Sequence, residues 1–149
     1  MLFRGVLAGA LLLSAGAVMA QQDLAVQQDN LMRTQAKYLY GVISRTVRGQ
    51  SPYDQAAIDA ALVQLEESVG KIATVFAVNP KEDVFGGDYG SSPKIWQNKA
   101  DFDSKIPPVT KAINDAKGKI KDVASLKAAY TEINDRCNDC HETYRLKLR

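Results

Sequence analysis

Apolar residues recur at helical spacing in four segments of the chain. We call each such row of apolar residues along one helix face a seam. The first seam consists of Met32, Ala36, Leu39, Ile43 and Val47. The second consists of Ile58, Leu62, Leu65, Val69, Ile72 and Phe76. The third and fourth consist of Ile95, Lys99, Phe102, Ile106, Val109, Ile113 and Ala116, and of Leu126, Tyr130, Ile133, Cys137, Cys140 and Tyr144. Steps of three and four residues predict amphipathic α-helices, and little of the remaining sequence alternates like a strand.

Residues with strong end preferences lie between these segments. The second helix is predicted to start at Ser51 and Pro52, and the third at Ser92 and Pro93. The fourth can be capped by Asp122 or Ser125. Pro107 and Pro108 interrupt the third seam, but the apolar phase is unchanged across them, which predicts one kinked helix. The glycine-rich stretch 79–92 has no periodicity and is predicted to be a long loop. The predicted fold is all-α, an antiparallel four-helix bundle.

The first twenty residues have the features of an export signal. Arg4 precedes a short apolar run, and Val18 and Ala20 fit the positions before a signal-peptidase cleavage site. We therefore expect residues 1–20 to be a cleaved signal peptide and 21–149 to be one mature domain. The run is too short to span a bilayer comfortably, so no membrane insertion of the mature chain is expected. Loss of Arg4 lowers the formal charge from +2 to +1, which gives no reason to expect nucleic-acid binding.

The chain concentrates its thiol and imidazole chemistry in five consecutive positions. Cys137 and Cys140 are its two cysteines and His141 its one histidine. A disulfide three residues apart would close a very small loop and stabilise little, and a thioredoxin-like pair needs a strand-to-helix setting. Zinc would find three ligands here but no fourth Cys or His to close the site.

Covalent haem attachment uses every part of C-x-x-C-H. The two thiols bind the vinyl groups of one haem c, and the imidazole of His141 binds the iron. Offsets of 0, 3 and 4 put the three side chains on one helix face, which continues the buried seam of the fourth helix. Met32, the one methionine of the mature chain, lies on the first seam. Two interpretations are open for it: a sixth ligand to the iron, or an ordinary core methionine.

The chain resembles the class II c-type cytochromes, the cytochrome c-prime superfamily. The resemblance rests on "CNDCHETYR", in which C-x-x-C-H is followed after two residues by the aromatic Tyr144 and the basic Arg145, and on "VRGQSPYD" and "SSPKIW". It covers essentially the whole mature chain. It implies a four-helix bundle with one covalently bound haem c near the C-terminus.

The same resemblance separates two branches of the family. In cytochrome c-prime the iron is five-coordinate, and an arginine often lies one turn before the sixth position. In the low-spin c-556 type a methionine on the first helix binds the iron. "QDNLMRTQ" puts Met32 at that position and Gln28 one turn earlier, so the chain is most like the c-556 type. A register shifted by one residue would put Arg33 there.

Other residues have both a haem-pocket interpretation and an ordinary one. Tyr144 and Trp96 fit either the haem pocket or plain core, and Arg145 fits either a propionate partner or a solvated charge. Gln28 is a further candidate pocket contact. The family often dimerises through its first two helices, so the strip of Leu31, Tyr38 and Val42 is either a homodimer surface or intramolecular core.

The function expected from these observations is one-electron transport by a periplasmic monohaem cytochrome of bacterial origin, acting between redox protein partners. The alternative is a five-coordinate cytochrome c-prime that binds nitric oxide or carbon monoxide. An enzyme is not expected, because the single histidine is committed to the iron and no other imidazole remains for acid–base catalysis.

Overall fold

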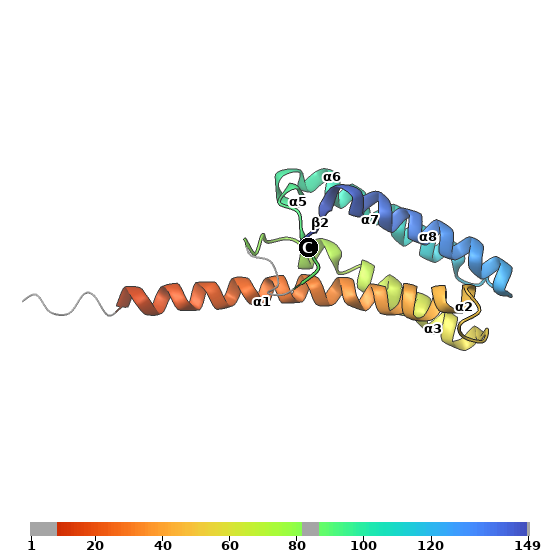
Figure 1. Cartoon of the computed structure of the whole chain (residues 1–149). Helices are drawn as coiled ribbons and strands as arrows, with labels where there is room; N and C mark the ends of the chain where they lie inside the picture. Colours follow the sequence, from red (N-terminus) through yellow and green to blue (C-terminus); the bar gives the residue numbers. More distant parts are fainter. Residues whose placement is uncertain (1–8, 82–86, 149) are drawn as a thin grey trace, which may run out of the picture.

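The computed structural model describes residues 9–81 and 87–148. The chain begins with a long helix made of α1 (Gly9–Tyr38), the π-helical segment η1 (Leu39–Ser44) and α2 (Arg45–Val47). Next come α3 (Gln55–Val69), α4 (Ile72–Val75), β1 (Tyr89–Ser91), α5 (Lys94–Gln97), α6 (Lys99–Ser104), α7 (Ile106–Ala116), α8 (Val123–Tyr144) and β2 (Arg145–Lys147). Figure 1 shows α1 and α8 running in opposite directions along the molecule.

The long helices pack as the predicted antiparallel bundle. Helix α1 packs on α3, α3 on α7 and α7 on α8, and the first half of α8 meets η1 and α2. The buried core draws on all four seams; for example, Ile43, Leu62, Ile113 and Leu126 are each at most 1% exposed. All six apolar positions of the second seam are buried, so the burial of apolar side chains drives the association of the helices.

Three helix starts were predicted, with different success. The start predicted at Ser92 and Pro93 is off by one residue, because α5 begins at Lys94 with Pro93 in the cap position. Asp122 caps α8 as predicted: its carboxylate accepts a hydrogen bond from the Ser125 backbone N–H, and Ser125 completes a capping box. The prediction of a cap at Ser51 is wrong, because α3 begins only at Gln55. There the carboxylate of Asp54, whose backbone is extended, accepts the N–H of Ala57. An aspartate in this conformation satisfies a free N–H as well as serine does, so the start moves three residues along the chain.

The third seam is divided more finely than predicted. The hydrogen-bond ladder is interrupted at Lys105, just before Pro107 and Pro108, which have no N–H to donate. Lys105 keeps α-helical backbone angles, but α6 and α7 are separate helices on either side of it, where one kinked helix was predicted. A second interruption at Asn98, with φ −135° and ψ 58°, separates α5 from α6 and was not predicted.

A short antiparallel ribbon joins two distant parts of the chain. β1 pairs with β2 so that Gly90 lies opposite Leu146 and Ser91 opposite Arg145. The Ser92 N–H donates to the Tyr144 carbonyl, and the Leu148 N–H to the Asp88 carbonyl. The prediction of a structureless loop at 79–92 is therefore wrong for 89–91, while residues 82–86 lie outside the described part. The ribbon fixes the end of α8 against the segment that precedes α5.

The predicted cleavage point lies within α1, which runs from Gly9 past Ala20. The basic start of the predicted signal peptide lies outside the described residues, and cleavage stays a prediction. Within the described residues no helix combines the length and the apolarity that crossing a membrane requires.

Candidate haem site

The C-x-x-C-H residues lie together on the second half of α8. Cys137, Cys140 and His141 are each partly buried, and both cysteines pack against the hydrophobic core. The neighbouring Asp139 is exposed, so the chain separates an inner reactive face from an outer polar one. This is the arrangement predicted from offsets of 0, 3 and 4 along a helix.

The thiols of Cys137 and Cys140 are free and form no disulfide. In the described part of the chain, no three His, Cys, Asp or Glu side chains are grouped as ligands of a metal ion.

Burial keeps the three groups uncharged near neutral pH. It raises the pKa of the Cys137 thiol to about 11, and the nearby Cys140 adds to the effect. Burial likewise raises the pKa of Cys140 to about 11, although Lys105 opposes it. Burial, with a smaller contribution from Arg145, lowers the pKa of His141 to about 4. A neutral imidazole is the form that binds a metal.

Three buried side-chain atoms in the described residues lack a protein hydrogen-bond partner. They are His141 Nδ1 on this face of α8, Gln35 Nε2 on α1 and Ser44 Oγ in η1. Gln35 follows Met32 by three residues, so the two side chains leave α1 on neighbouring parts of one face. Buried polar atoms are normally paired. Two soft thiols, a neutral imidazole and unpaired polar atoms together fit a large, mainly apolar group with polar edges, as haem c is.

Met32 lies on α1, which forms the opposite side of the bundle from α8 (Figure 1). Its side chain is partly buried and packs against the core. The adjacent Arg33 points outward, where its guanidinium pairs with Asp29 at 2.5 Å and its side chain is 66% exposed. Of these two neighbours, Met32 is therefore the one on the inner face.

One hydrogen bond, from η1, sets the register of the continuous helix α1–η1 against α8. The Tyr40 hydroxyl donates to Asn134 Oδ1 at 3.0 Å. Met32 precedes Tyr40 by eight residues and His141 follows Asn134 by seven. At 1.5 Å per residue these separations are about 12 and 10.5 Å. Because the helices run in opposite directions, Met32 and His141 lie at nearly the same height along the bundle.

Gln28 makes protein contacts with its whole side-chain amide. Nε2 donates to the carbonyls of Val75 at 3.3 Å and Val78 at 3.2 Å, and Oε1 accepts from Ser91 Oγ at 2.9 Å. The residue is only 2% exposed. It is buried as a pocket residue would be, and it joins α1 to the segment 75–91.

The other candidate pocket residues also have defined partners. The buried Tyr144 donates its hydroxyl to Asp101 Oδ2 at 2.5 Å and meets the Phe102 ring edge-on. The guanidinium of Arg145 lies 4.7 Å from the centre of the Tyr89 ring. Trp96 Nε1 donates to the Phe76 carbonyl at 3.0 Å. Haem contacts for these residues stay predictions.

Sequence reasoning missed several residues around the site, namely Gln35, Tyr40, Ser91, Asp101 and Asn134. Gln35 had a usable signal, because a glutamine on the apolar face of a helix needs a polar partner. Hydrogen bonds such as that between Tyr40 and Asn134, 94 positions apart, leave no pattern in a single sequence.

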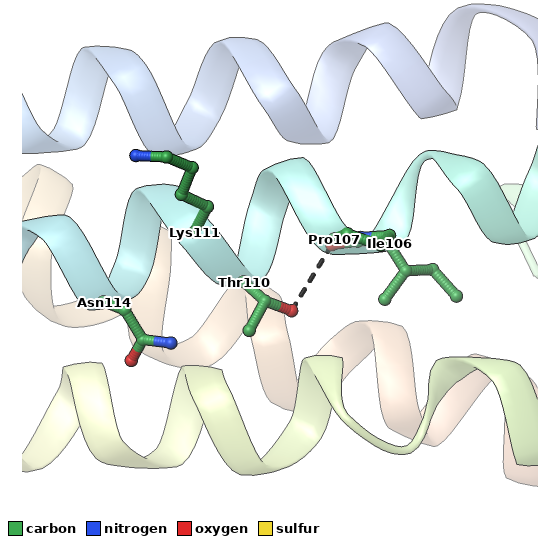
Figure 2. A pocket seen from close by; sticks show the side chains of 5 residues that line it. All are labelled: Ile106, Pro107, Thr110, Lys111 and Asn114. Atoms are coloured by element: carbon green, nitrogen blue, oxygen red, sulfur yellow. Dashed lines mark hydrogen bonds between the residues drawn. The ribbon is translucent and has the colours of Figure 1, made fainter.

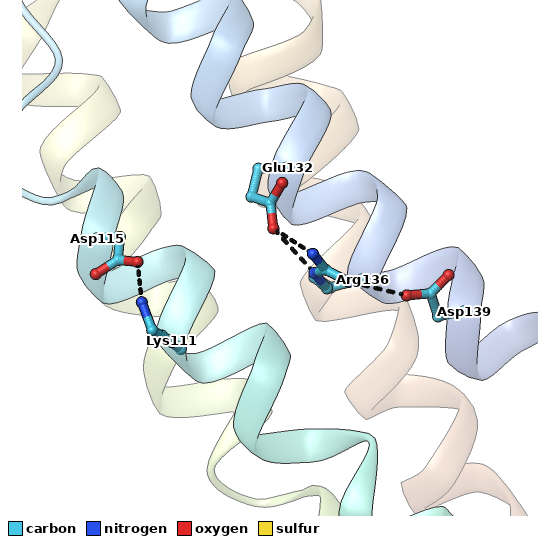
Figure 3. A network of polar contacts seen from close by, with 5 residues as sticks. All are labelled: Lys111, Asp115, Glu132, Arg136 and Asp139. Atoms are coloured by element: carbon cyan, nitrogen blue, oxygen red, sulfur yellow. Dashed lines mark hydrogen bonds and ion pairs between the residues drawn. The ribbon is translucent and has the colours of Figure 1, made fainter.

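The outer face of α8 carries ion pairs. Arg136 bonds both Glu132 and Asp139, while Lys111 and Asp115 pair on the neighbouring α7 (Figure 3). Each of these pairs lies within one helix. Such exposed pairs contribute little to stability.

Two open depressions flank α7 and are separate from the predicted site. One, of about 510 Å³, is lined by Ile106, Pro107, Thr110, Lys111 and Asn114, and Figure 2 shows the Thr110 hydroxyl bonded back to the Ile106 carbonyl. The other, of about 540 Å³, lies between α7 and α8 and is lined partly by Lys111, Asp115, Glu132 and Arg136. No predicted haem-site residue lines either of them.

Comparison with known proteins places the chain in a family. The family model described as cytochrome c' matches residues 23–145. Cytochrome c-555 of Bradyrhizobium diazoefficiens is 70% identical over 139 residues, 93% of each chain, and cytochrome c-556 of Rhodopseudomonas palustris is 46% identical over 143 residues, 95% of each chain. The structure of oxidised cytochrome c556 from R. palustris superimposes with a TM-score of 0.72 at 41% identity, covering 86% of this chain and 99% of that one.

These relationships agree with the two features found independently in the sequence and the fold, the C-x-x-C-H face of α8 and the antiparallel bundle around it. They confirm the predicted resemblance, the fold class and the cofactor. The chain belongs to the cytochrome c-prime family of class II c-type cytochromes, four-helix bundles that hold covalent haem c.

Proposed function

We propose that the chain is a periplasmic electron carrier in which Cys137 and Cys140 attach haem c and His141 and Met32 are the axial ligands. The observation that carries this proposal is the common height of Met32 and His141, set by the hydrogen bond between Tyr40 and Asn134. A thioether and an imidazole on facing helices at one height can bind the same metal from opposite sides.

The environment of each ligand supports this assignment. His141 is neutral near pH 7 because burial lowers its pKa to about 4, so its nitrogen lone pair is available. Met32 is half-buried against the core, whereas Arg33, the alternative at a shifted register, is held at the surface by Asp29. A leucine or isoleucine at position 32 would pack equally well but would offer no ligand atom.

When bound, haem c supplies a one-electron ferric/ferrous couple. The chain's contribution is to hold two ligands in place, exclude water and shield the centre with helices. Methionine and histidine together raise the reduction potential and leave no coordination position open. A closed site favours electron transfer over catalysis, which needs an open position and a distal acid–base group.

The place and partners of the protein follow from the same proposal. Residues 1–20 would direct export, and the mature protein would exchange electrons with redox proteins of the bacterial periplasm. Its relatives are named cytochromes, which are electron carriers.

The test is an optical spectrum of the mature haem protein in the ferric and ferrous states, before and after adding carbon monoxide. We expect a low-spin spectrum with a weak far-red sulfur-to-iron band and no change with carbon monoxide. Met32→Leu should lose the band and bind carbon monoxide. Leu39→Met, a comparable change two turns along the same face, should keep the wild-type spectrum.

The opposite outcome has a clear meaning. A wild-type high-spin spectrum that changes at once with carbon monoxide would exclude Met32 as a ligand. It would favour the alternative of a five-coordinate protein that binds nitric oxide or carbon monoxide.

A further inference from the structure

We infer that Gln28 is a positioning residue that holds α1 and α8 at the separation at which Met32 stays bound to the iron. This inference rests on the proposed function. It follows from the positions of the hydrogen bonds that hold the two helices together, each of which we call a tie.

The first tie between the helices is the bond from Tyr40 to Asn134, on the side of Met32 toward the middle of α8. From this point α8 leads away from α1 toward its C-terminal end (Figure 1). One hydrogen bond at one end of a diverging pair cannot fix the distance at the other end. A second tie is needed beyond Met32 and His141.

Gln28 provides that second tie. It precedes Tyr40 by twelve residues, about 18 Å of helix, and α8 continues for ten residues, about 15 Å, beyond Asn134 to the start of β2, so Gln28 lies near the level of β2. Its Oε1 accepts from Ser91 Oγ at 2.9 Å, and Ser91 is paired with Arg145 in the ribbon. The next residue, Ser92, donates its N–H to the carbonyl of Tyr144, the last residue of α8.

The same side chain anchors the segment that leads into the ribbon. Gln28 Nε2 donates to the carbonyls of Val75 and Val78, which end α4 and the turn after it. All three bonds are made by an amide that is 2% exposed. A buried amide with every group satisfied is costly to replace, because each former partner then loses its own hydrogen bond.

Met32 and His141 therefore lie between two ties, with Tyr40 and Asn134 on one side and Gln28 and Ser91 on the other. Met32 is one helical turn from Gln28 and two turns from Tyr40. Loosening the Gln28 tie frees the end of α8 that carries His141 to move relative to α1. A thioether is the weaker of the two axial ligands, so it is the bond that such a movement breaks.

The experiment compares Gln28→Met with Gln27→Met in the haem protein. Methionine keeps the length of glutamine at position 28 but removes all three hydrogen bonds. Gln27 is exposed, so the same change there is the matched control. For Gln28→Met we expect a weakened far-red band, about tenfold faster binding of carbon monoxide to the ferrous protein, and about tenfold faster amide exchange at Ser92 and Leu148. Gln27→Met should match the wild type in all three measurements.

Ser91→Ala is the second variant, since it removes one bond and keeps the fold even where Gln28→Met does not. It should show the same changes in smaller degree. The inference would be overturned if amide exchange at Ser92 and Leu148 became faster while the far-red band and carbon monoxide binding stayed unchanged. In that case the hydrogen bonds of Gln28 would not affect the binding of Met32 to the iron. Unchanged exchange in both variants would also overturn it.

Failure of the proposed function gives a different result. In that case the wild type itself lacks the far-red band and binds carbon monoxide, whatever residue stands at position 28.

Discussion

Tyr144 illustrates how one side chain combines burial with a charged partner. Its ring is 4% exposed and lies edge-on against Phe102, while its hydroxyl donates to the Asp101 carboxylate. That bond, together with burial, raises the pKa of Tyr144 to about 12. The residue immediately precedes β2, so its hydroxyl ties the end of α8 to α6.

Replacing Tyr144 with phenylalanine should lower the free energy of unfolding by about 1–2 kcal/mol at pH 7, because a hydrogen bond to a charged group is lost. The pH dependence should change as well. A tyrosine ionises near pH 10 in the unfolded chain and near 12 in the folded one, so the wild type loses stability as pH rises through this window. Tyr144→Phe should lose less over the same range.

Urea unfolding followed by circular dichroism, at intervals from pH 7 to 12, measures both effects. Tyr89→Phe is the control, because the Tyr89 side chain is half exposed and its ring contact with Arg145 survives the change. Parallel curves for wild type and Tyr144→Phe above pH 10 would contradict the assignment of the shift to Tyr144.

Residue identity alone was enough to single out the candidate haem ligands, but not the residues that support them. Cysteine, histidine and methionine carry ligand atoms that few other residues offer, so Cys137, Cys140, His141 and Met32 could be singled out from sequence. Asp101 and Asn134 act only through a partner far along the chain, and their residue types are common on any helix surface. Their roles depend on tertiary contacts that a single sequence does not encode in any local pattern.

At the scale of elements, the helices followed from periodicity, but only some of the breaks between them did. A seam such as Ile58 to Phe76 is repeated often enough to predict burial of every member. The starts of helices depend on competition among neighbouring capping residues, and Asp54 outcompetes Ser51. In the tail, Tyr144, Leu146 and Leu148 alternate with polar residues, a weak strand signal that becomes β2 only because β1 lies alongside.

Two glycines should respond to alanine in opposite directions. Gly118, between α7 and α8, has φ +71°, and no atom lies within 4 Å of the position that a methyl group would take, so only its backbone conformation demands glycine. Gly118→Ala should destabilise the protein by about 1–2 kcal/mol. Gly41 lies inside η1 with equally open space and no positive φ. Gly41→Ala should stabilise it by about 0.5–1 kcal/mol.

The midpoint of urea unfolding measures the change in stability caused by each of the two substitutions. The slope of the transition is expected to stay constant. Destabilisation by both changes would indicate that the π-helical segment needs glycine at position 41 for a reason other than space or φ.

At the scale of the whole molecule, the burial of α8 changes along its length. Leu126 and Ile133 in its first half are 0% and 1% exposed, because η1, α2 and α7 cover them. Cys137, Cys140 and His141 in its second half are only partly buried, and His141 Nδ1 is buried without a protein partner. The polypeptide thus packs closely around the first half of α8, and the proposed haem site lies along the second half.

The chain without haem should therefore remain folded in part. In Cys137→Ala/Cys140→Ala, which cannot attach haem c, we expect the core around Leu126 and Ile133 to keep its helices. Backbone amides from 137 to 144 should exchange at least about tenfold faster than in the haem protein, because this segment carries the residues that we propose hold the haem. Amides around Ile58 to Val69 in α3 should change much less.

Hydrogen exchange read by mass spectrometry, on haem-bound and haem-free protein, resolves these segments. Uniform acceleration over all helices would mean that the haem is needed for the whole bundle to form, not for one half of it. Protection of 137–144 equal to that in the haem protein would mean that the two cysteines and His141 are already held in place by the polypeptide. The expected gradient instead makes the first half of α8 a preformed support, against which the segment that carries Cys137, Cys140 and His141 becomes ordered when haem is attached.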